Sequence, residues 1–370
     1  MLISKQDGAP PDFFCDFFVV EPTALGFEWD LKARGRYGFV PRTGAVMNYF
    51  ISDTYLGHEA VIKCAARPFD SVYDVDETII ARWNARVNNG DTVYIVGDLC
   101  WETSDAPRYL SRLNGKKILI TGNHDEKWLS RTDGAKYFEL VTAYSETEID
   151  RVKITLCHYP MLEWRNSRKR GSKKLGYLIH GRMHRRADES FKQMLMLPHA
   201  LNAGADLNDF TPVTFDELVK NNETFKLSAL ADISDKALFL AEKYHLYQTD
   251  ISGAPYAEHP KAVAAMLDGK IDKCVALLHD LLEDTDIDIG LLQSNFPPEV
   301  VAAVVADTRK AGEDYFDYIA RVAENPIATR VKLADLSHNM DVTRLRTVTD
   351  ADIARLEKYE KAYALLSANL

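Results

Sequence analysis

Short apolar runs bounded by turn-forming residues recur from residue 47 to about residue 225. Runs of this kind are typical of buried β-strands. We expect strands at Tyr49–Ile51, Thr92–Val96, Lys117–Thr121, Val152–Cys157 and Tyr177–His180. Helical spacing of apolar residues lies between them, for example over Val75–Val87. Alternating strands and helices predict an α/β fold for this part of the chain.

The pattern changes near residue 228, where apolar residues begin to recur at helical spacing. We expect helices at Ala237–Tyr244, Lys261–Leu267, Lys273–Leu282, Pro298–Ala306 and Ala351–Leu366. The pattern predicts an all-α bundle, with a hinge at Asn221-Asn222-Glu223-Thr224. We divide the chain into an extension of unknown role (1–46), an α/β domain (47–225) and a helical domain (226–370). Met47, which opens the clear pattern, is an alternative start.

Composition narrows the class of protein. Of the 370 residues, 46% are apolar and 27% charged, as in ordinary globular proteins. The net charge of −10 argues against general nucleic-acid binding. The longest early apolar run, Phe13–Val20, is too short to span a membrane. Five scattered cysteines without a CxxC pair indicate a reducing compartment, so we expect a cytoplasmic protein.

One basic cluster stands out, Arg165 to Lys174, with the sequence RNSRKRGSKK. A solvated loop is the favoured interpretation, because runs of like charge usually face water. The alternative is a loop that contacts a phosphorylated substrate.

Carboxylate, amide and imidazole groups follow the expected strands of the α/β part. They are Asp53, Asp98, Asn123 with His124 and Asp125, His158 and His184. This mixture suits two divalent metals that share a carboxylate, an arrangement that activates water and neutralises a phosphoester transition state. Each group alone is more often structural; the ordered set is far more specific.

These motifs, GD, GNHD, CHYP and HGRMH, resemble those of calcineurin-like metallophosphoesterases from Met47 to about Asn222. The resemblance implies an αββα sandwich. It implies metal ligands at Asp53, Asp98, Asn123, His158 and His184, with Asp98 as the bridge, and a transition-state role for His124. Two positions depart from the pattern, because Tyr55 and Arg182 stand where the family has histidines.

The departures remove one expected ligand from each metal. Arg182 cannot ligate a metal, but its guanidinium can bind a substrate phosphate. His58 and His180 are nearby substitutes, although His180 lies at the wrong depth on its strand. The N-terminal site is therefore weakened, single-metal or purely phosphate-binding.

The helical part carries a second set of ligands on separate helices: His259, the pair His279-Asp280, and Asp335. Two imidazoles and two carboxylates make a good site for Mn²⁺, Fe²⁺ or Zn²⁺. Glu283 and Asp284 stand four residues after His279 and Asp280, so they project from the same region of the helix. A solvated helix end explains LLEDTDID alone, but not the whole set.

The blocks GAPYAEHP, VALLHDLLEDT and RVKLADLSHNMDVTRL resemble the HD hydrolases of the RelA/SpoT (alarmone) type over about residues 230–345. The resemblance implies metal ligands at His259, His279, Asp280 and Asp335. It implies that Glu283 and Asp284 polarise the attacking water, and that Asn339 and Arg330 contact the nucleotide or support the site. One departure concerns the substrate: residues 245–252 lack the usual Arg and Lys.

Three hypotheses follow. The first is a hydrolase whose helical domain removes pyrophosphate from a nucleotide such as (p)ppGpp, with Mn²⁺ as the first choice of metal and Fe²⁺, Zn²⁺ or Mg²⁺ as alternatives. The second is phosphodiesterase or phosphatase activity of the α/β domain. The third makes that domain a non-catalytic, phosphate-binding regulator. All three predict a phosphorylated small molecule or nucleotide as the ligand, and no membrane partner.

Overall fold

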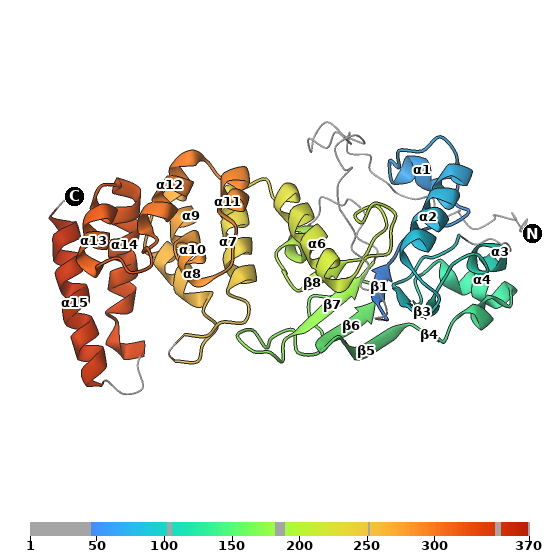
Figure 1. Cartoon of the computed structure of the whole chain (residues 1–370), viewed down its shortest axis with the longest axis horizontal. Helices are drawn as coiled ribbons and strands as arrows, with labels where there is room; N and C mark the ends of the chain where they lie inside the picture. Colours follow the sequence, from blue (N-terminus) through green and yellow to red (C-terminus); the bar gives the residue numbers. More distant parts are fainter. Residues whose placement is uncertain (1–45, 102–105, 182–188, 251, 345–348, 369–370) are drawn as a thin grey trace, which may run out of the picture.

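Two four-stranded sheets form the first part of the chain (Figure 1). The computed structural model describes residues 46–101, 106–181, 189–250, 252–344 and 349–368. The first sheet is parallel and has the order β1 (Asn48–Ile51), β2 (Thr92–Ile95), β3 (Lys116–Ile120) and β4 (Leu140–Thr142). The second has the order β5 (Tyr144–Ile149), β6 (Val152–Cys157), β7 (Gly176–His180) and β8 (Ala200–Asn202), in which only β5 and β6 pair antiparallel.

The sheets bury apolar side chains against each other. Phe50 and Ile120 of the first sheet, with Val96 directly after β2, share one core with Leu156 and Ile179 of the second. The opposite face of the first sheet packs against helices of its own. They are α1 (Val61–Cys64), α2 (Val72–Arg86), α3 (Ala106–Leu110) and α4 (Asp125–Arg131), with a 3-10 turn at Gly134–Tyr137. The outer face of the second sheet packs against α5 (Glu189–Leu195).

A helical part follows. Helix α6 (Phe215–Ala229) leads into it through a capping box at Thr214. The remaining helices are α7 (Ile233–Tyr244), α8 (Glu258–Ala265), α9 (Lys270–Leu278), α10 (Leu281–Asp284), α11 (Ile289–Asn295), α12 (Pro298–Asp307), α13 (Tyr315–Ala323), α14 (Pro326–Asn339) and α15 (Asp350–Ser367), with a 3-10 turn at Val342–Arg344.

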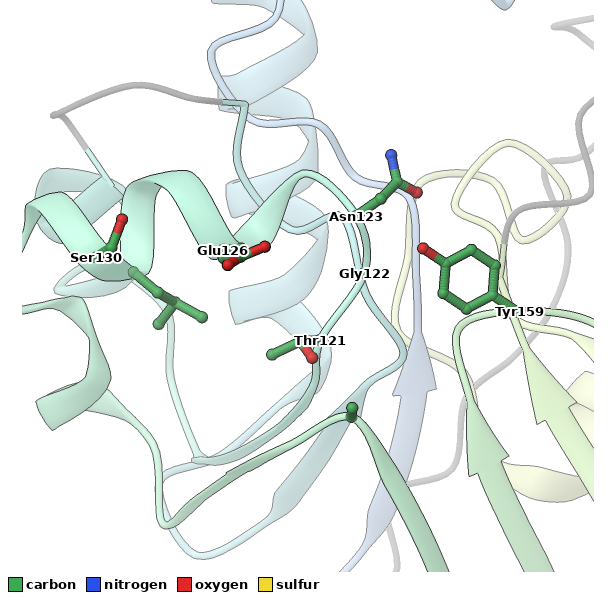
Figure 2. A pocket seen from close by; sticks show the side chains of 8 residues that line it. Thr121, Gly122, Asn123, Glu126, Ser130 and Tyr159 are labelled. Carbon is green, nitrogen blue, oxygen red and sulfur yellow. The ribbon is translucent and has the colours of Figure 1, made fainter.

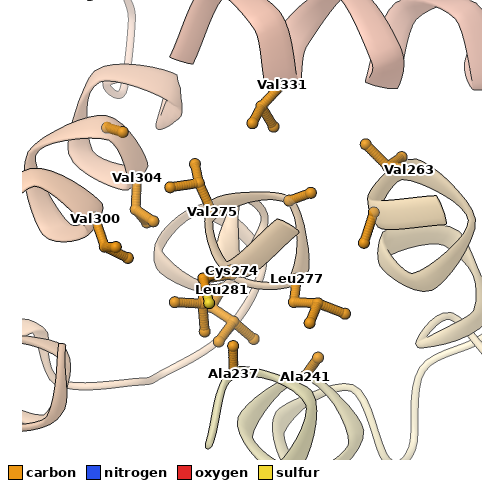
Figure 3. Packing of buried hydrophobic residues seen from close by; sticks show 14 of the residues in the cluster. Ala237, Ala241, Val263, Cys274, Val275, Leu277, Leu281, Val300, Val304 and Val331 are labelled. Atoms are coloured by element: carbon orange, nitrogen blue, oxygen red, sulfur yellow. The ribbon is translucent and has the colours of Figure 1, made fainter. Parts of the chain in front are cut away.

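Helix α9 is the centre of this helical core (Figure 3). Its residues from Cys274 to Leu278 are all buried, and it packs against α7, α8, α12 and α14. A helix that is apolar on every side is stable only inside a core. The same core includes Leu195 of α5 and Leu227 of α6, so its packing reaches back into the preceding elements.

The five expected strands are present, each within one residue of its expected bounds. Strands β4, β5 and β8 were not expected. The prediction of a hinge at residues 221–224 is wrong, because these residues lie inside α6. Asn222 is buried there, and its side chain is bonded to β8. The division into domains stays a prediction, and residues 1–45 lie outside the described part. Among the described residues, no helix is long and apolar enough to cross a membrane.

Candidate functional sites

Glycines make room for the first site at the ends of β1, β2 and β3. Asp53 and Asp98 follow β1 and β2, and both have a φ of 54°. A Cβ on Gly97 would lie 2.3 Å from Nδ1 of His158, and one on Gly122 would lie 2.2 Å from Oδ1 of Asp98. Only glycine lets the backbone approach these side chains so closely. The GD and GN motifs therefore have a geometric cause.

Asp53, Asp98 and His158 form a cluster whose ligand atoms lie within 4.8 Å of one another, and all three are buried. Nδ1 of His158 is 2.9 Å from the carbonyl oxygen of Val96, so an Nδ1–H donates there. Its Nε2 is buried without a hydrogen bond, 3.4 Å from Oδ2 of Asp98. Burial alone lowers the pKa of His158, but Asp98 and Asp53 raise it to about 9. This cluster of negative charge fits a bound cation.

Tyr55 adds a direct contact to this cluster. Its hydroxyl donates to Oδ2 of Asp98 at 2.9 Å and therefore competes for the oxygen expected to bridge two metals. His180 does not join the group of converging ligand atoms formed by Asp53, Asp98 and His158. Its Nδ1 lies 2.8 Å from the carbonyl oxygen of Gly181, and burial lowers its pKa to about 4. Arg182 and His184 lie outside the described residues.

Asn123 and His124 lie beside the cluster. The backbone N–H of His124 donates to Asp98 at 3.0 Å, and its Nε2 is 4.0 Å from the same carboxylate. Asn123, Glu126 and Tyr159 line an open pocket of about 600 Å³ (Figure 2). The pocket adjoins the cluster through the loop residues Gly122 and Asn123.

Two residues that the sequence left without a role hold this site in place. Asp125 accepts hydrogen bonds from the backbone of Asp98 and Gly122 and from Nε1 of Trp128, so it ties the loops after β2 and β3 together. Arg67 has a fully buried side chain and donates to the carbonyl oxygen of Asp53 at 2.7 Å. Nothing in the local sequence around Arg67 indicates this long-range contact.

The second set of expected ligands converges from three places in the helical part. His259 belongs to α8, Asp335 belongs to α14, and His279-Asp280 forms the turn between α9 and α10. Nε2 of His259 lies 3.1 Å from Oδ1 of Asp335 and 3.6 Å from Oδ2 of Asp280. Nε2 of His279 lies 3.1 Å from Oδ2 of Asp280 and 3.8 Å from Oδ1 of Asp335.

Both imidazoles present Nε2 to the carboxylates. Nδ1–H of His279 donates to the carbonyl oxygen of Ala276 at 2.7 Å, and its Nε2 is buried without a hydrogen bond. Nδ1 of His259 lies 2.8 Å from Nδ1 of His338. Burial lowers the pKa of His279, but Asp280 and Asp335 raise it to about 10. The carboxylates that raise this pKa also favour a divalent cation, which would bind Nε2 in place of its proton, so these groups fit a metal.

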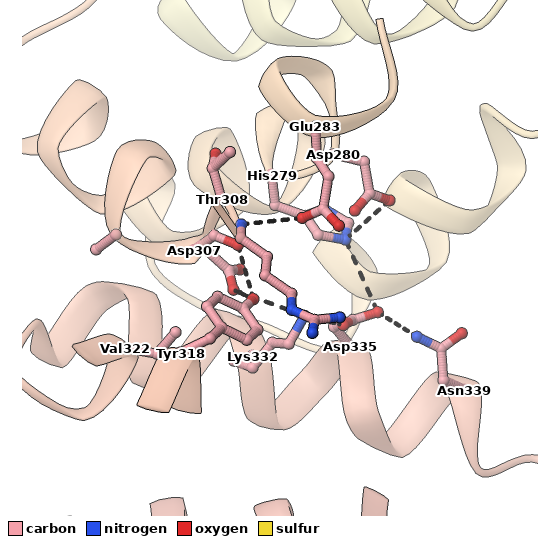
Figure 4. Close-up of polar contacts among 12 residues, drawn as sticks. His279, Asp280, Glu283, Asp307, Thr308, Tyr318, Val322, Lys332, Asp335 and Asn339 are labelled. Carbon is pink, nitrogen blue, oxygen red and sulfur yellow. Dashed lines mark hydrogen bonds and ion pairs between the residues drawn. The ribbon is translucent and has the colours of Figure 1, made fainter. Parts of the chain in front are cut away.

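A buried network surrounds Asp335 (Figure 4). Lys332 lies 2.9 Å from its Oδ2, and Asn339 donates to its Oδ1 at 2.6 Å. Lys332 also lies 3.7 Å from Asp307, whose other contact is the hydroxyl of Tyr318 at 2.7 Å. Lys332 offsets much of the negative charge, and it holds the pKa of Asp335 well below its usual range despite the opposing effect of burial.

The expected water-polarising residues lie at the rim. Asp284 accepts from the hydroxyl of Tyr256 at 3.2 Å, and the same hydroxyl donates to Asp280 at 2.7 Å. Burial and the nearby Asp280 raise the pKa of Asp284. Glu283 accepts from the backbone N–H of Arg309 at 3.0 Å. Arg330 forms a bidentate pair with Asp272 of α9 at 2.7 and 2.8 Å, which commits its guanidinium to the fold.

Comparisons with known proteins match parts of the chain. No protein-family model matches the chain. An uncharacterized protein of Methanocaldococcus jannaschii is 29% identical over 182 residues, which make up 48% of this chain and 93% of that protein. A probable GTP pyrophosphokinase of Mycobacterium leprae is 33% identical over 153 residues, 38% of this chain and 19% of that protein. A GTP pyrophosphokinase of Brucella melitensis is 33% identical over 139 residues, 34% of this chain and 18% of that protein.

Part of the chain is therefore homologous to RelA/SpoT-type enzymes, and the chain spans less than a fifth of the length of these two pyrophosphokinases. Two solved structures are also similar. A protein of unknown function from Aquifex aeolicus has 27% identity and a TM-score of 0.38, over 48% of this chain and 99% of that one. A metazoan ortholog of SpoT that hydrolyzes ppGpp has 23% identity and a TM-score of 0.33, over 37% of this chain and 86% of that one. These TM-scores are too low to assign a fold.

Proposed function

We propose that the chain is a metal-dependent hydrolase of nucleotide pyrophosphates that works at the helical site, with (p)ppGpp as the leading substrate. One observation carries the proposal: two imidazoles and two carboxylates meet there, and the buried Nε2 of His279 has no hydrogen bond. Homology of part of the chain to RelA/SpoT-type enzymes supports the nucleotide class.

His259, His279, Asp280 and Asp335 would hold the cation, for which we propose Mn²⁺. A divalent ion in such a site supplies Lewis acidity and makes water available as a nucleophile near neutral pH. Tyr256 and Lys332 orient the carboxylates of Asp280 and Asp335 by direct contact.

Asp284 and Glu283 would orient the water and accept its proton. The raised pKa of Asp284 suits such a role, because a general base works best when its pKa approaches the working pH. Asn339 would position Asp335 through its bond to Oδ1, and we keep nucleotide contact as its second proposed role. For Arg330 the pair with Asp272 supports a structural role.

Product analysis tests this proposal. We expect the full chain with Mn²⁺ to convert ppGpp into GDP and pyrophosphate, both identified by ³¹P NMR. We expect Asp280→Asn to lose this conversion while keeping its fold, because asparagine preserves the shape but not the anionic ligand. Products other than pyrophosphate, or full activity of Asp280→Asn, would exclude the proposed chemistry.

A second candidate function rests on the buried Asp53, Asp98 and His158 cluster. We propose that residues 47–225 form a calcineurin-like sandwich, which the two facing sheets support. Its site would either hydrolyse phosphodiesters or bind phosphate as a regulatory site without catalysis. The hydroxyl of Tyr55 on Asp98 favours the regulator, because it occupies a ligand oxygen. Hydrolysis of bis(p-nitrophenyl) phosphate that Asp98→Asn abolishes would favour the phosphodiesterase instead.

A further inference from the structure

The basic loop, residues 165–174, docks on the segment that precedes the GAPY motif. The backbone N–H of Gly171 donates to the carbonyl oxygen of Leu246 at 2.8 Å. The hydroxyls of Tyr177 and Tyr247 lie 2.8 Å apart, close to the same junction. A Cβ on Gly171 would lie only 2.5 Å from Cγ2 of Thr249. The two segments are thus in direct contact, although more than 70 residues separate them in the chain.

An ion-pair network anchors the loop to the helix that carries His259. Arg170 pairs with Glu242 of α7 at 2.5 Å, and the side chain of Glu242 is only 8% exposed. Glu242 also pairs with Lys261, which lies two residues after His259 in α8. Nη1 of Arg170 makes this pair, and because Glu242 also holds Lys261, the position of the loop relative to α8 is fixed.

The docked segment in turn contacts the helical site. Gln248 donates to the carbonyl oxygen of Asp284 at 2.8 Å, and its Oε1 lies 2.6 Å from Nδ1 of His245. The N–H of Tyr256 donates to the carbonyl oxygen of Gln248, while the hydroxyl of Tyr256 reaches Asp280. The basic loop is therefore connected to the proposed metal ligands through one layer of residues.

A cavity of about 290 Å³ lies at this junction. Ser167, Arg168 and Arg170 of the loop line it together with His199 and with Pro255 of the GAPY motif. His199 is 1% exposed, and burial lowers its pKa to about 4, so it is neutral. Its Nε2–H donates to the carbonyl oxygen of Ser167, and its Nδ1 is buried without a hydrogen bond. The lone pair of this Nδ1 therefore has no donor among the described residues.

The distribution of positive charge around the helical site shows why an anionic ligand needs this loop. The helical site is lined by carboxylates, and residues 245–250 contain neither Lys nor Arg. Nearby cations are committed, Lys332 to Asp335 and Lys261 to Glu242. Within the part of the chain that the structure describes, the exposed Lys173 and Lys174 form no ion pair, and Arg168 pairs only with Glu163 on the cavity rim. These loop cations are therefore the positive charges of this region that are left for a substrate with several phosphates.

We propose that the basic loop and this cavity form a nucleotide-phosphate subsite of the helical site. The loop cations bind phosphates remote from the reacting bond, and His199 accepts a hydrogen bond from the nucleoside. The cavity is at the small end of the range of ligand pockets, roughly 300–1,000 Å³, which fits part of a nucleotide. The inference rests on the proposed function for the reaction, but the binding that it requires can be measured alone.

Charge removal tests the subsite. Steady-state hydrolysis of ppGpp with Mn²⁺ is measured for the full chain, for Lys173→Gln/Lys174→Gln, and for Lys63→Gln/Lys361→Gln, two exposed lysines of α1 and α15 that match the charge change. We expect the loop variant to raise KM about tenfold and to leave kcat within about twofold, since binding remote from the reacting bond is uniform. A KM equal to that of the matched control overturns the subsite.

Displacement of the loop tests its position without changing charge. Gly171 has a φ of +70° and would clash as alanine, whereas Gly312 has a φ of +77° and faces open space. We expect Gly171→Ala to raise KM and Gly312→Ala to leave it unchanged; equal KM values count against the subsite.

If the wild type releases no pyrophosphate, the proposed function fails, and calorimetric titration with ppGpp decides the subsite. Weaker binding of ppGpp by Lys173→Gln/Lys174→Gln than by Lys63→Gln/Lys361→Gln supports the subsite, and equal binding refutes it.

Discussion

A buried lysine predicts how stability depends on pH. Lys226 of α6 is 3% exposed, and its Nζ donates to the carbonyl oxygens of Leu197 and Ala200 at 2.5 and 2.7 Å. These bonds tie α6 to the segment between α5 and β8. Burial, helped by the charge of Lys243, lowers the pKa of Lys226 from 10.5 to about 7. Its ammonium form is therefore disfavoured in the folded protein.

The sign and size of the effect follow from linkage. Between pH 7 and 10.5 the unfolded chain holds the proton that the folded protein releases, so the free energy of unfolding rises with pH across this window. Below pH 7 the full penalty of about 5 kcal/mol applies. From pH 7 to pH 9 the penalty falls by about 2 kcal/mol. Lys226→Met removes the titrating group and should lose this contribution.

Denaturant unfolding at pH 7, 8 and 9 measures the contribution of Lys226 to the free energy of unfolding. The free energy of unfolding of the wild type, relative to that of Lys226→Met, should rise by about 2 kcal/mol between pH 7 and pH 9. Lys220→Met, at an exposed lysine of the same helix, should show a constant difference. A constant difference for Lys226→Met as well would mean that the two carbonyls keep the ammonium charged, and would refute the reasoning.

Three further predictions concern the sites. Asp280→Asn should lower Mn²⁺ retained by the full chain after dialysis, and unchanged metal content would contradict its role as a ligand. Glu283→Gln should keep the metal but lower kcat by about 10²–10⁴-fold, and a rate within about twofold of wild type would remove Glu283 from the mechanism. Tyr55→His with Arg182→His should raise metal content, because the substitution removes the hydroxyl that contacts Asp98 and supplies imidazole. No rise would show that other groups already complete that site.

Local pattern predicted the elements that carry the ligands. Asp53 and Asp98 follow runs of buried β residues, and His279-Asp280 ends a helix with a long buried apolar run, so the pattern located these positions and the family resemblances proposed their roles. The three-residue strands β4 and β8 are too short for periodicity to register. A hinge was expected at residues 221–224, near the change of hydrophobic pattern, whereas the side chain of Asn222 bonds to β8 from inside a helix.

Contacts between distant parts of the chain were not predictable. Arg67 is buried against Asp53, and Lys332 reaches Asp307 as well as its helix neighbour Asp335, and only the fold reveals the contacts between distant residues. The basic loop was expected to face water, yet Arg170 is paired with a buried carboxylate of α7. Charge patterning gives the composition of such a loop but not the surface on which it docks.

The central claim is that the helical site hydrolyses a nucleotide pyrophosphate. Pyrophosphate release from ppGpp with Mn²⁺ should be followed for the full chain, for Asp280→Asn and for Asp98→Asn. We expect release by the wild type and by Asp98→Asn, and none by Asp280→Asn. No release by the wild type, or loss in Asp98→Asn with retention in Asp280→Asn, would contradict it.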